Sequence, residues 1–210
     1  MKKNRVKILH RPSTLQTFYC LSNTATWVEK LQGTGRPYEA FLQKLMVKKY
    51  FLNIEERKTV KWMASELGFE TNQVTKWIKE IYDDIFELNY YHPNIFQSDG
   101  IKHSLHFRYY DDSEVLTVWL SQTPRVHEKL ECYFVKARIG TDNFWVSEVK
   151  HEIQNGNQHI HITLKGGFHN TYREQLIQRA LFEKVIGLRE LYDMYEFEMD
   201  ELLLKHYDKN

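Results

Sequence analysis

A polar run between residues 71 and 79 carries side chains that could contact duplex DNA. Asparagine and glutamine can each form two hydrogen bonds with adenine, and lysine can reach guanine or a phosphate. The candidate residues in this run are Asn72, Gln73, Thr75, Lys76 and Lys79. Three more cations precede it in the chain, at Lys44, Lys48 and Lys49. Together they form the predicted DNA-binding set, because they offer contacts to both base edges and phosphates.

The run must be positioned by two helices joined by a short turn, expected within residues 56–88. Thr59 can cap the first helix, and Gly68 is expected to end it, because glycine adopts the left-handed conformation without a Cβ penalty. Thr71 or Asn72 is expected to cap the second helix. The buried stripe of the second helix would comprise Val74, Trp77, Ile78, Ile81 and Ile85. That stripe leaves the polar run on the opposite face.

The spacing of three residues in this segment is typical of a helix-turn-helix motif. Ala64, Gly68 and Val74 stand where the motif has a small residue, a turn glycine and a buried aliphatic residue. Residues 57–88 therefore resemble that motif at the level of a superfamily. The resemblance implies that the second helix enters the major groove of double-stranded DNA, and that the protein is a transcriptional regulator. Under this interpretation the protein is not an enzyme and needs no cofactor.

Charge is distributed unevenly along the chain. Residues 1–50 contain ten lysines and arginines against two glutamates, whereas residues 188–210 contain three against seven acidic residues. A basic end facing a polyanion and an acidic end facing away would produce this pattern. The second helix turns acidic after Lys79, so only its first half is expected to enter a groove. The basic segment would then supply most of the affinity.

A second pattern indicates metal-dependent chemistry on DNA. His159 and His161 alternate along an expected strand, so both imidazoles fall on one face. The segment resembles the His-hydrophobic-His strand of single-strand DNA nickases, in which two histidines hold a divalent metal and a helical tyrosine is the nucleophile. The resemblance implies a metal pair at His159 and His161, with the nucleophile at Tyr172, Tyr192 or Tyr195. The hairpin register also fits an ordinary polar ladder, with the histidines beside Glu148, Lys150 and Glu152.

Other reactive side chains are dispersed. The remaining histidines considered as ligands are expected at surfaces or interfaces, because no two of them have the helical i, i+4 spacing of a ligand pair: His92, His103, His106, His127, His151 and His169. A third interpretation of the whole chain is a protein-interaction module that does not bind DNA.

The order of expected elements predicts an α+β fold. An N-terminal helical unit that contains the helix-turn-helix would precede a five-stranded antiparallel meander packed by C-terminal helices. The strands are expected near residues 105–109, 115–120, 130–139, 144–153 and 159–165. Asn155-Gly156 is a strong hairpin signal, because both central positions of a type I′ turn need positive φ. A helix capped by Asn170 or Thr171 would follow, reaching about Ile186.

Four segments are expected from these elements. They are a basic arm with N-terminal helices (1–35), the helix-turn-helix unit (36–92), the sheet with one helix (100–187) and an acidic amphipathic helix (188–210). A helix beginning at Pro37 would open the second segment. In the last segment Leu188, Tyr192, Tyr195, Met199 and Leu202 form a heptad-like seam. A homodimer through residues 188–207 is therefore a possible partner arrangement, which would suit a palindromic DNA site.

The amino-acid composition indicates an ordinary globular protein rather than a membrane or secreted one. The chain has 210 residues, with 42% hydrophobic and 27% charged, as in ordinary globular proteins. No apolar run approaches the roughly 20 residues needed to cross a bilayer, and the N-terminus lacks the apolar core of a signal peptide. Two cysteines, Cys20 and Cys132, stand far apart, so the expected location is a reducing cytoplasm.

Overall fold

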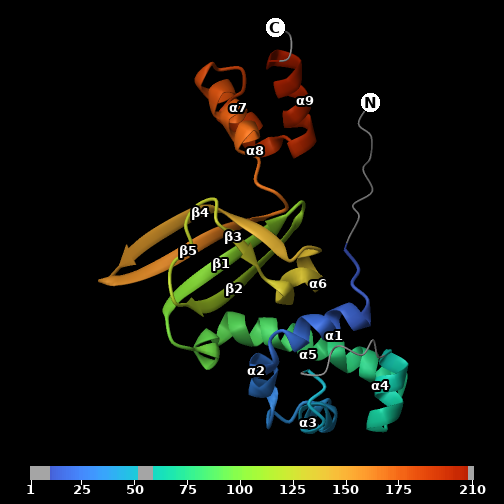
Figure 1. The fold of residues 1–210 in the computed structure, drawn as a ribbon. Helices are drawn as coiled ribbons and strands as arrows, with labels where there is room; N and C mark the ends of the chain where they lie inside the picture. The colour runs from blue at the N-terminus through green and yellow to red at the C-terminus, as the bar shows by residue number, and fades with distance from the viewer. Residues whose placement is uncertain (1–9, 52–58, 208–210) are drawn as a thin grey trace. The chain divides into compact units, whose positions relative to one another are not determined.

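The computed structural model describes residues 10–51 and 59–207. The chain divides into two compact units, residues 1–167 and 168–210, and each is described by itself. Residues 1–9 of the predicted basic arm lie outside the described residues. The α+β class is confirmed, since helices and a five-stranded sheet occur together in the first unit (Figure 1).

The first unit begins with helical elements and ends with the sheet. The helices are α1 (Thr14–Ser22), α2 (Ala25–Val28), η1 (Glu29–Leu31), α3 (Glu39–Val47), α4 (Val60–Leu67), α5 (Thr71–Tyr91) and η2 (Pro93–Phe96). The sheet region comprises β1 (Ile101–Tyr109), β2 (Asp112–Leu120), β3 (Lys129–Glu131), η3 (Tyr133–Val135), α6 (Lys136–Ile139), β4 (Asn143–Gln154) and β5 (Asn157–Gly166).

The sheet is mixed, so the predicted antiparallel meander is wrong. The strand order is β2-β1-β5-β4-β3, and β1 runs parallel to β5 in the middle of the sheet. The two hairpins, β1–β2 and β4–β5, are antiparallel as expected. Leu105 and Phe107 of β1 and Ile162 and Leu164 of β5 are all buried. The buried residues of β1 and β5 therefore meet in the middle of the sheet, although the two strands are distant in the chain.

The predicted third strand over residues 130–139 is also wrong beyond its first residues. Only Lys129–Glu131 forms a strand, and the chain then turns into η3 and α6. Phe134, Val135, Ala137 and Ile139 are buried there. Over so few residues this pattern fits a helical turn as well as a strand. Gly140 ends α6 with a φ of +90°.

Helix α5 connects the helical part of the unit to the sheet. Figure 1 shows α5 along one face of the sheet, with α3 and α4 on the side of α5 that is away from the sheet. Its buried residues are Val74, Ile78, Ile81, Tyr82, Ile85, Phe86 and Asn89. They belong to one hydrophobic core with the inward residues of the strands. Helices α4 and α5 therefore share one hydrophobic core with the sheet in the first unit.

Within the first unit, α5 and α6 pack on the sheet, and the C-terminal helices that the sequence predicted there belong to the second unit. The second unit contains α7 (Thr171–Phe182), α8 (Leu188–Asp193) and α9 (Glu196–Tyr207). These helices have a core of their own, made by Ala180, Ile186, Met199 and Leu203. The single helix predicted over residues 188–210 is broken between α8 and α9, so the proposed seam is not continuous. Leu188 and Tyr195 of that seam are exposed, whereas Met199 is buried.

A buried asparagine joins α5 to the edge of the sheet. Strand β2 is an edge strand, and edge strands leave backbone N–H and C=O groups without a neighbouring strand. Asn89, which is 1% exposed, donates from Nδ2 to the carbonyl oxygen of Thr117 and accepts from the N–H of Thr117 at Oδ1, both at 2.8 Å. The side-chain amide thereby takes the place of a strand at one position of β2.

Replacing Asn89 with Ala is expected to lower the free energy of unfolding by about 2 kcal/mol, because both backbone groups of Thr117 lose a partner. Urea denaturation followed by circular dichroism measures this change. The control Thr117→Val keeps the backbone bonds and should cost less than about 1 kcal/mol. Equal stability of Asn89→Ala and the parent protein would show that the two hydrogen bonds between Asn89 and Thr117 contribute nothing to stability.

Candidate functional site

The predicted polar run begins just after a tight turn between α4 and α5. Thr59 caps α4, because its hydroxyl oxygen accepts from the backbone N–H three residues later at 3.1 Å. Gly68 follows α4 with a φ of +73°, the left-handed conformation expected for it. Glu70 occupies the N-cap of α5, so the cap predicted at Thr71 or Asn72 is wrong. Both residues lie inside the first turn of the helix.

The candidate residues on α5 point away from the core. All five are exposed: Asn72, Gln73, Thr75, Lys76 and Lys79. Val74 lies on the opposite side of the same turns and is fully buried. Ala64 of α4 is buried too, and its small side chain lets the two helices approach closely. Half-buried Trp77 packs edge-on against Phe69, which fixes the turn on α5.

The predicted lysines of α3 lie against the end of α4. Lys44 donates from Nζ to the carbonyl oxygen of Leu67 at 2.7 Å, and the same ammonium lies 4.4 Å from the centre of the Phe69 ring. Lys48 forms an ion pair with Glu66 at 2.6 Å. Cations at a helix C-terminus stabilise its carbonyl groups. Two of the three lysines are thus engaged within the protein, while Lys49 is exposed just after α3.

An arginine from α6 covers the acidic side of α5. Arg138 forms an ion pair with Asp83 of α5 at 2.9 Å and a second with Glu114 of β2 at 2.5 Å. Its guanidinium also lies 3.9 Å from the centre of the Phe86 ring. The arrangement joins α5, α6 and β2 through one half-buried cation, and it neutralises one of the carboxylates expected to repel DNA.

A second acidic residue of α5 is engaged in a similar way. Asp84 accepts a hydrogen bond from the hydroxyl of Tyr38 at 2.5 Å and lies 3.5 Å from Nε of Arg36. Burial, together with the bond to Asp84, raises the pKa of Tyr38, so its hydroxyl remains protonated as the donor. Glu80 lies 3.5 Å from Lys76 of the next turn back. The acidic half of α5 is therefore largely paired with cations of its own unit.

The histidines of β5 lie on the polar face of the sheet, as their register predicts. His161 is the cross-strand partner of Lys150 and His159 that of Glu152. Within the described part of the chain, no group of three close histidine, cysteine or carboxylate side chains includes His159 or His161. His161 instead contacts His106 of β1, with His106 Nε2 3.4 Å from His161 Nδ1. The sequence did not single out His106, because the contact depends on β1 lying beside β5.

The tyrosines expected as nucleophiles belong to the second unit. Tyr172 and Tyr195 are exposed there, and the side chain of Tyr192 lies outside what the structure describes. The two parts of the nickase alternative, the histidine pair and the tyrosine, therefore come from different compact units.

One histidine predicted at the surface is buried. His103 of β1 is 1% exposed. Its Nδ1 lies 2.7 Å from the carbonyl oxygen of Ile101, and its Nε2 lies 2.9 Å from the hydroxyl of Thr123. Burial lowers the pKa of His103, so the ring is neutral at pH 7 and serves as a hydrogen-bonding core residue. Periodicity alone could have indicated this, since His103 shares a face with Leu105 and Phe107.

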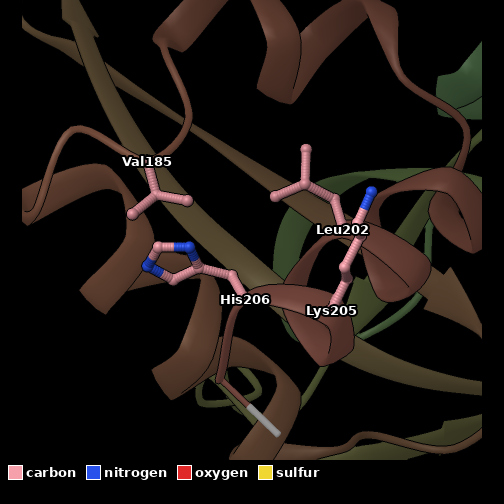
Figure 2. A pocket seen from close by; sticks show the side chains of 4 residues that line it. All are labelled: Val185, Leu202, Lys205 and His206. Atoms are coloured by element: carbon pink, nitrogen blue, oxygen red, sulfur yellow. The ribbon is translucent and has the colours of Figure 1, made fainter. Parts of the chain in front are cut away.

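A small hollow lies in the second unit. It has a volume of about 300 Å³ and is lined by Val185, Leu202, Lys205 and His206 (Figure 2). Two of these side chains are apolar and two can be cationic.

Neither cysteine is activated. Both are free thiols, Cys20 buried and Cys132 half-buried. Burial is the main cause that raises the pKa of each thiol to about 11. Because the thiolate is the nucleophile, cysteine-based catalysis at neutral pH does not fit these positions.

No protein-family model, curated protein or solved structure matches this chain. Within the described ranges, the helices also lack the combination of length and apolarity that crossing a membrane requires. Function is therefore inferred from side-chain geometry alone.

The native thiols should resist alkylation. With a pKa of about 11, only about one Cys132 thiol in a thousand is ionised at pH 8. Iodoacetamide should therefore modify the folded protein at least about 100-fold more slowly than it modifies the same chain in urea, as measured by mass spectrometry. The rate should rise with pH. Rapid labelling of Cys132 in the folded protein at pH 7 would contradict the assigned burial.

Proposed function

We propose that the protein binds double-stranded DNA as a transcriptional regulator and contacts base edges with the first half of α5. The observation that carries this proposal is the exposed polar face at the start of α5, set directly after the turn from α4. Asn72 and Gln73 supply amide groups that can pair with adenine, and Lys76 and Lys79 supply cations for guanine or phosphate.

The dimensions of α5 suit this role. A helix with its side chains is about 10–12 Å across, and the major groove of B-form DNA is about 12 Å wide. The first turn of a helix presents backbone N–H groups that favour a phosphate. Buried Val74 and Ala64 hold α5 against α4, so the polar face keeps its orientation.

Internal ion pairs support the proposal electrostatically. Asp83 and Asp84 would repel phosphates if they were free, but both are paired with arginines of the same unit. Lys61, in the first turn of α4, is a further exposed cation. Because Lys44 and Lys48 are engaged at the end of α4, exposed Lys61 and Lys79 carry more of the phosphate contact than the sequence indicated. Lys76 adds to it when a phosphate displaces Glu80 as its partner.

A homodimer through residues 188–207 remains part of the proposal. Leu188 and Tyr195 are exposed on α8 and at the start of α9, where a second copy could cover them. Two copies would place two α5 helices on a palindromic site.

Removing two cations of α5 tests the DNA interface. The double variant Lys76→Ala/Lys79→Ala should bind a duplex pool at least about tenfold more weakly than the parent protein, because two phosphate contacts are lost. Fluorescence anisotropy between about 50 and 200 mM salt should also show the slope of log affinity against log salt reduced by about 2.

The control is Lys129→Ala, which removes an exposed lysine of β3 and should leave binding unchanged. If the parent protein binds no duplex at low salt, or if the double variant binds as well as the control, the proposal fails. A chain with neither DNA binding nor cleavage would fit the protein-interaction module instead, and a pull-down would then identify its partner.

A further inference from the structure

Two histidines from distant parts of the chain meet on the polar face of the sheet. His106 lies on β1 and His161 on β5, and these strands run parallel beside each other. His106 is half-buried and alternates with the core residues Leu105 and Phe107, so it projects from the opposite face. His161 alternates with buried Ile160 and Ile162 in the same way. Each ring therefore extends from a strand in the centre of the sheet, which is the most rigid position that a sheet offers.

The separation of the two ring nitrogens suits a shared metal ion. Nε2 of His106 lies 3.4 Å from Nδ1 of His161. This is longer than the 2.7–3.2 Å usual for a hydrogen bond from a protein N–H group. A tetrahedral zinc ion with Zn–N distances of 2.0–2.1 Å holds two nitrogen ligands about 3.3–3.4 Å apart. The observed separation thus matches the bite of a metal better than a direct bond between the rings.

A carboxylate stands on the far side of the His161 ring. Oε2 of Glu152, on β4, lies 3.8 Å from Nε2 of His161 and also 3.6 Å from Nζ of Lys150. At 3.8 Å the separation is longer than a hydrogen bond, so the carboxylate acts on the ring through its charge, which favours a proton on Nε2 over one on Nδ1. The lone pair is then on Nδ1, which faces His106. Metal-binding histidines commonly have such a carboxylate behind them, which orients the ring and raises its basicity.

We propose that Nε2 of His106 and Nδ1 of His161 bind a divalent transition-metal ion such as Zn²⁺ or Ni²⁺, with Glu152 as a positioning residue. Water completes the coordination of the ion. Imidazole nitrogens select zinc, nickel and copper over magnesium and calcium, which prefer oxygen ligands. The site is independent of the proposed DNA interface, because its residues lie on the sheet and not on α4 or α5. It also differs from the His159 and His161 pair that the sequence indicated.

The test is a titration of the full chain with Zn²⁺ after treatment with a chelator. Binding is followed by isothermal calorimetry, with Ni²⁺ and Mg²⁺ titrated in parallel. His106→Gln and His161→Gln should each weaken one equivalent of Zn²⁺ binding by at least about tenfold, and Glu152→Gln should weaken it about tenfold through loss of ring orientation. Mg²⁺ should give no signal at the site. Circular dichroism without metal verifies that each variant is folded.

Two further histidines serve as matched controls. His151→Gln removes an exposed histidine of β4, and His159→Gln removes the other histidine on the polar face of β5; both should leave the titration unchanged. The proposal is overturned if His106→Gln binds Zn²⁺ like the parent protein. It is also overturned if His161→Gln binds as many equivalents of Zn²⁺, with the same affinity, as the parent protein. Loss of binding in His159→Gln but not in His106→Gln would assign the ion to the same-strand pair instead.

Discussion

The structure of the first unit depends on the burial of one long helix, α5, against both the other helices and the sheet. The stripe of α5 that includes Val74, Ile78 and Ile81 meets the helical elements, and its later residues meet the sheet region. Polar contacts fix the position of α5 on the sheet region, because apolar contact is not directional and does not by itself set a register. Asn89 bonds the backbone of β2, and the hydroxyl of Tyr82 donates to the carbonyl oxygen of Phe134 at 2.6 Å. The orientation of the exposed face of α5 follows from these same contacts.

Internal pairing decides which charges are available to a partner. Arg138 and Arg36 take up carboxylates of α5, while Lys44 and Lys48 lie against the end of α4. A net charge of +1 therefore says little about the surface. The DNA interface proposed for α5 relies on exposed lysines that follow the turn, together with the withdrawal of acidic groups from its second half. Local ion pairing thus supports an interface that the overall charge does not favour.

The central position of β1 beside β5 has a chemical consequence as well as a structural one. Parallel pairing of these strands buries Phe107 and Leu164 on one face and brings His106 to His161 on the other. The same residues in a meander would have kept the histidines apart. The proposed metal site is thus a product of strand order, and its rigidity derives from the core beneath it.

Local pattern determined much of this protein. The cap at Thr59, the left-handed Gly68, the stripe of α5 and the turn at Asn155-Gly156, with φ values of +52° and +80°, all depend on residues within a few positions of one another. The local sequence also predicted that His159 and His161 lie beside Glu152 and Lys150, because a tight turn sets the register of a hairpin. Tertiary structure alone decided the strand order, the helical turn at residues 133–139, the break between α8 and α9, and the partner of His106. Each of these depends on burial against segments distant in the chain, where several local patterns fit equally well and only packing separates them.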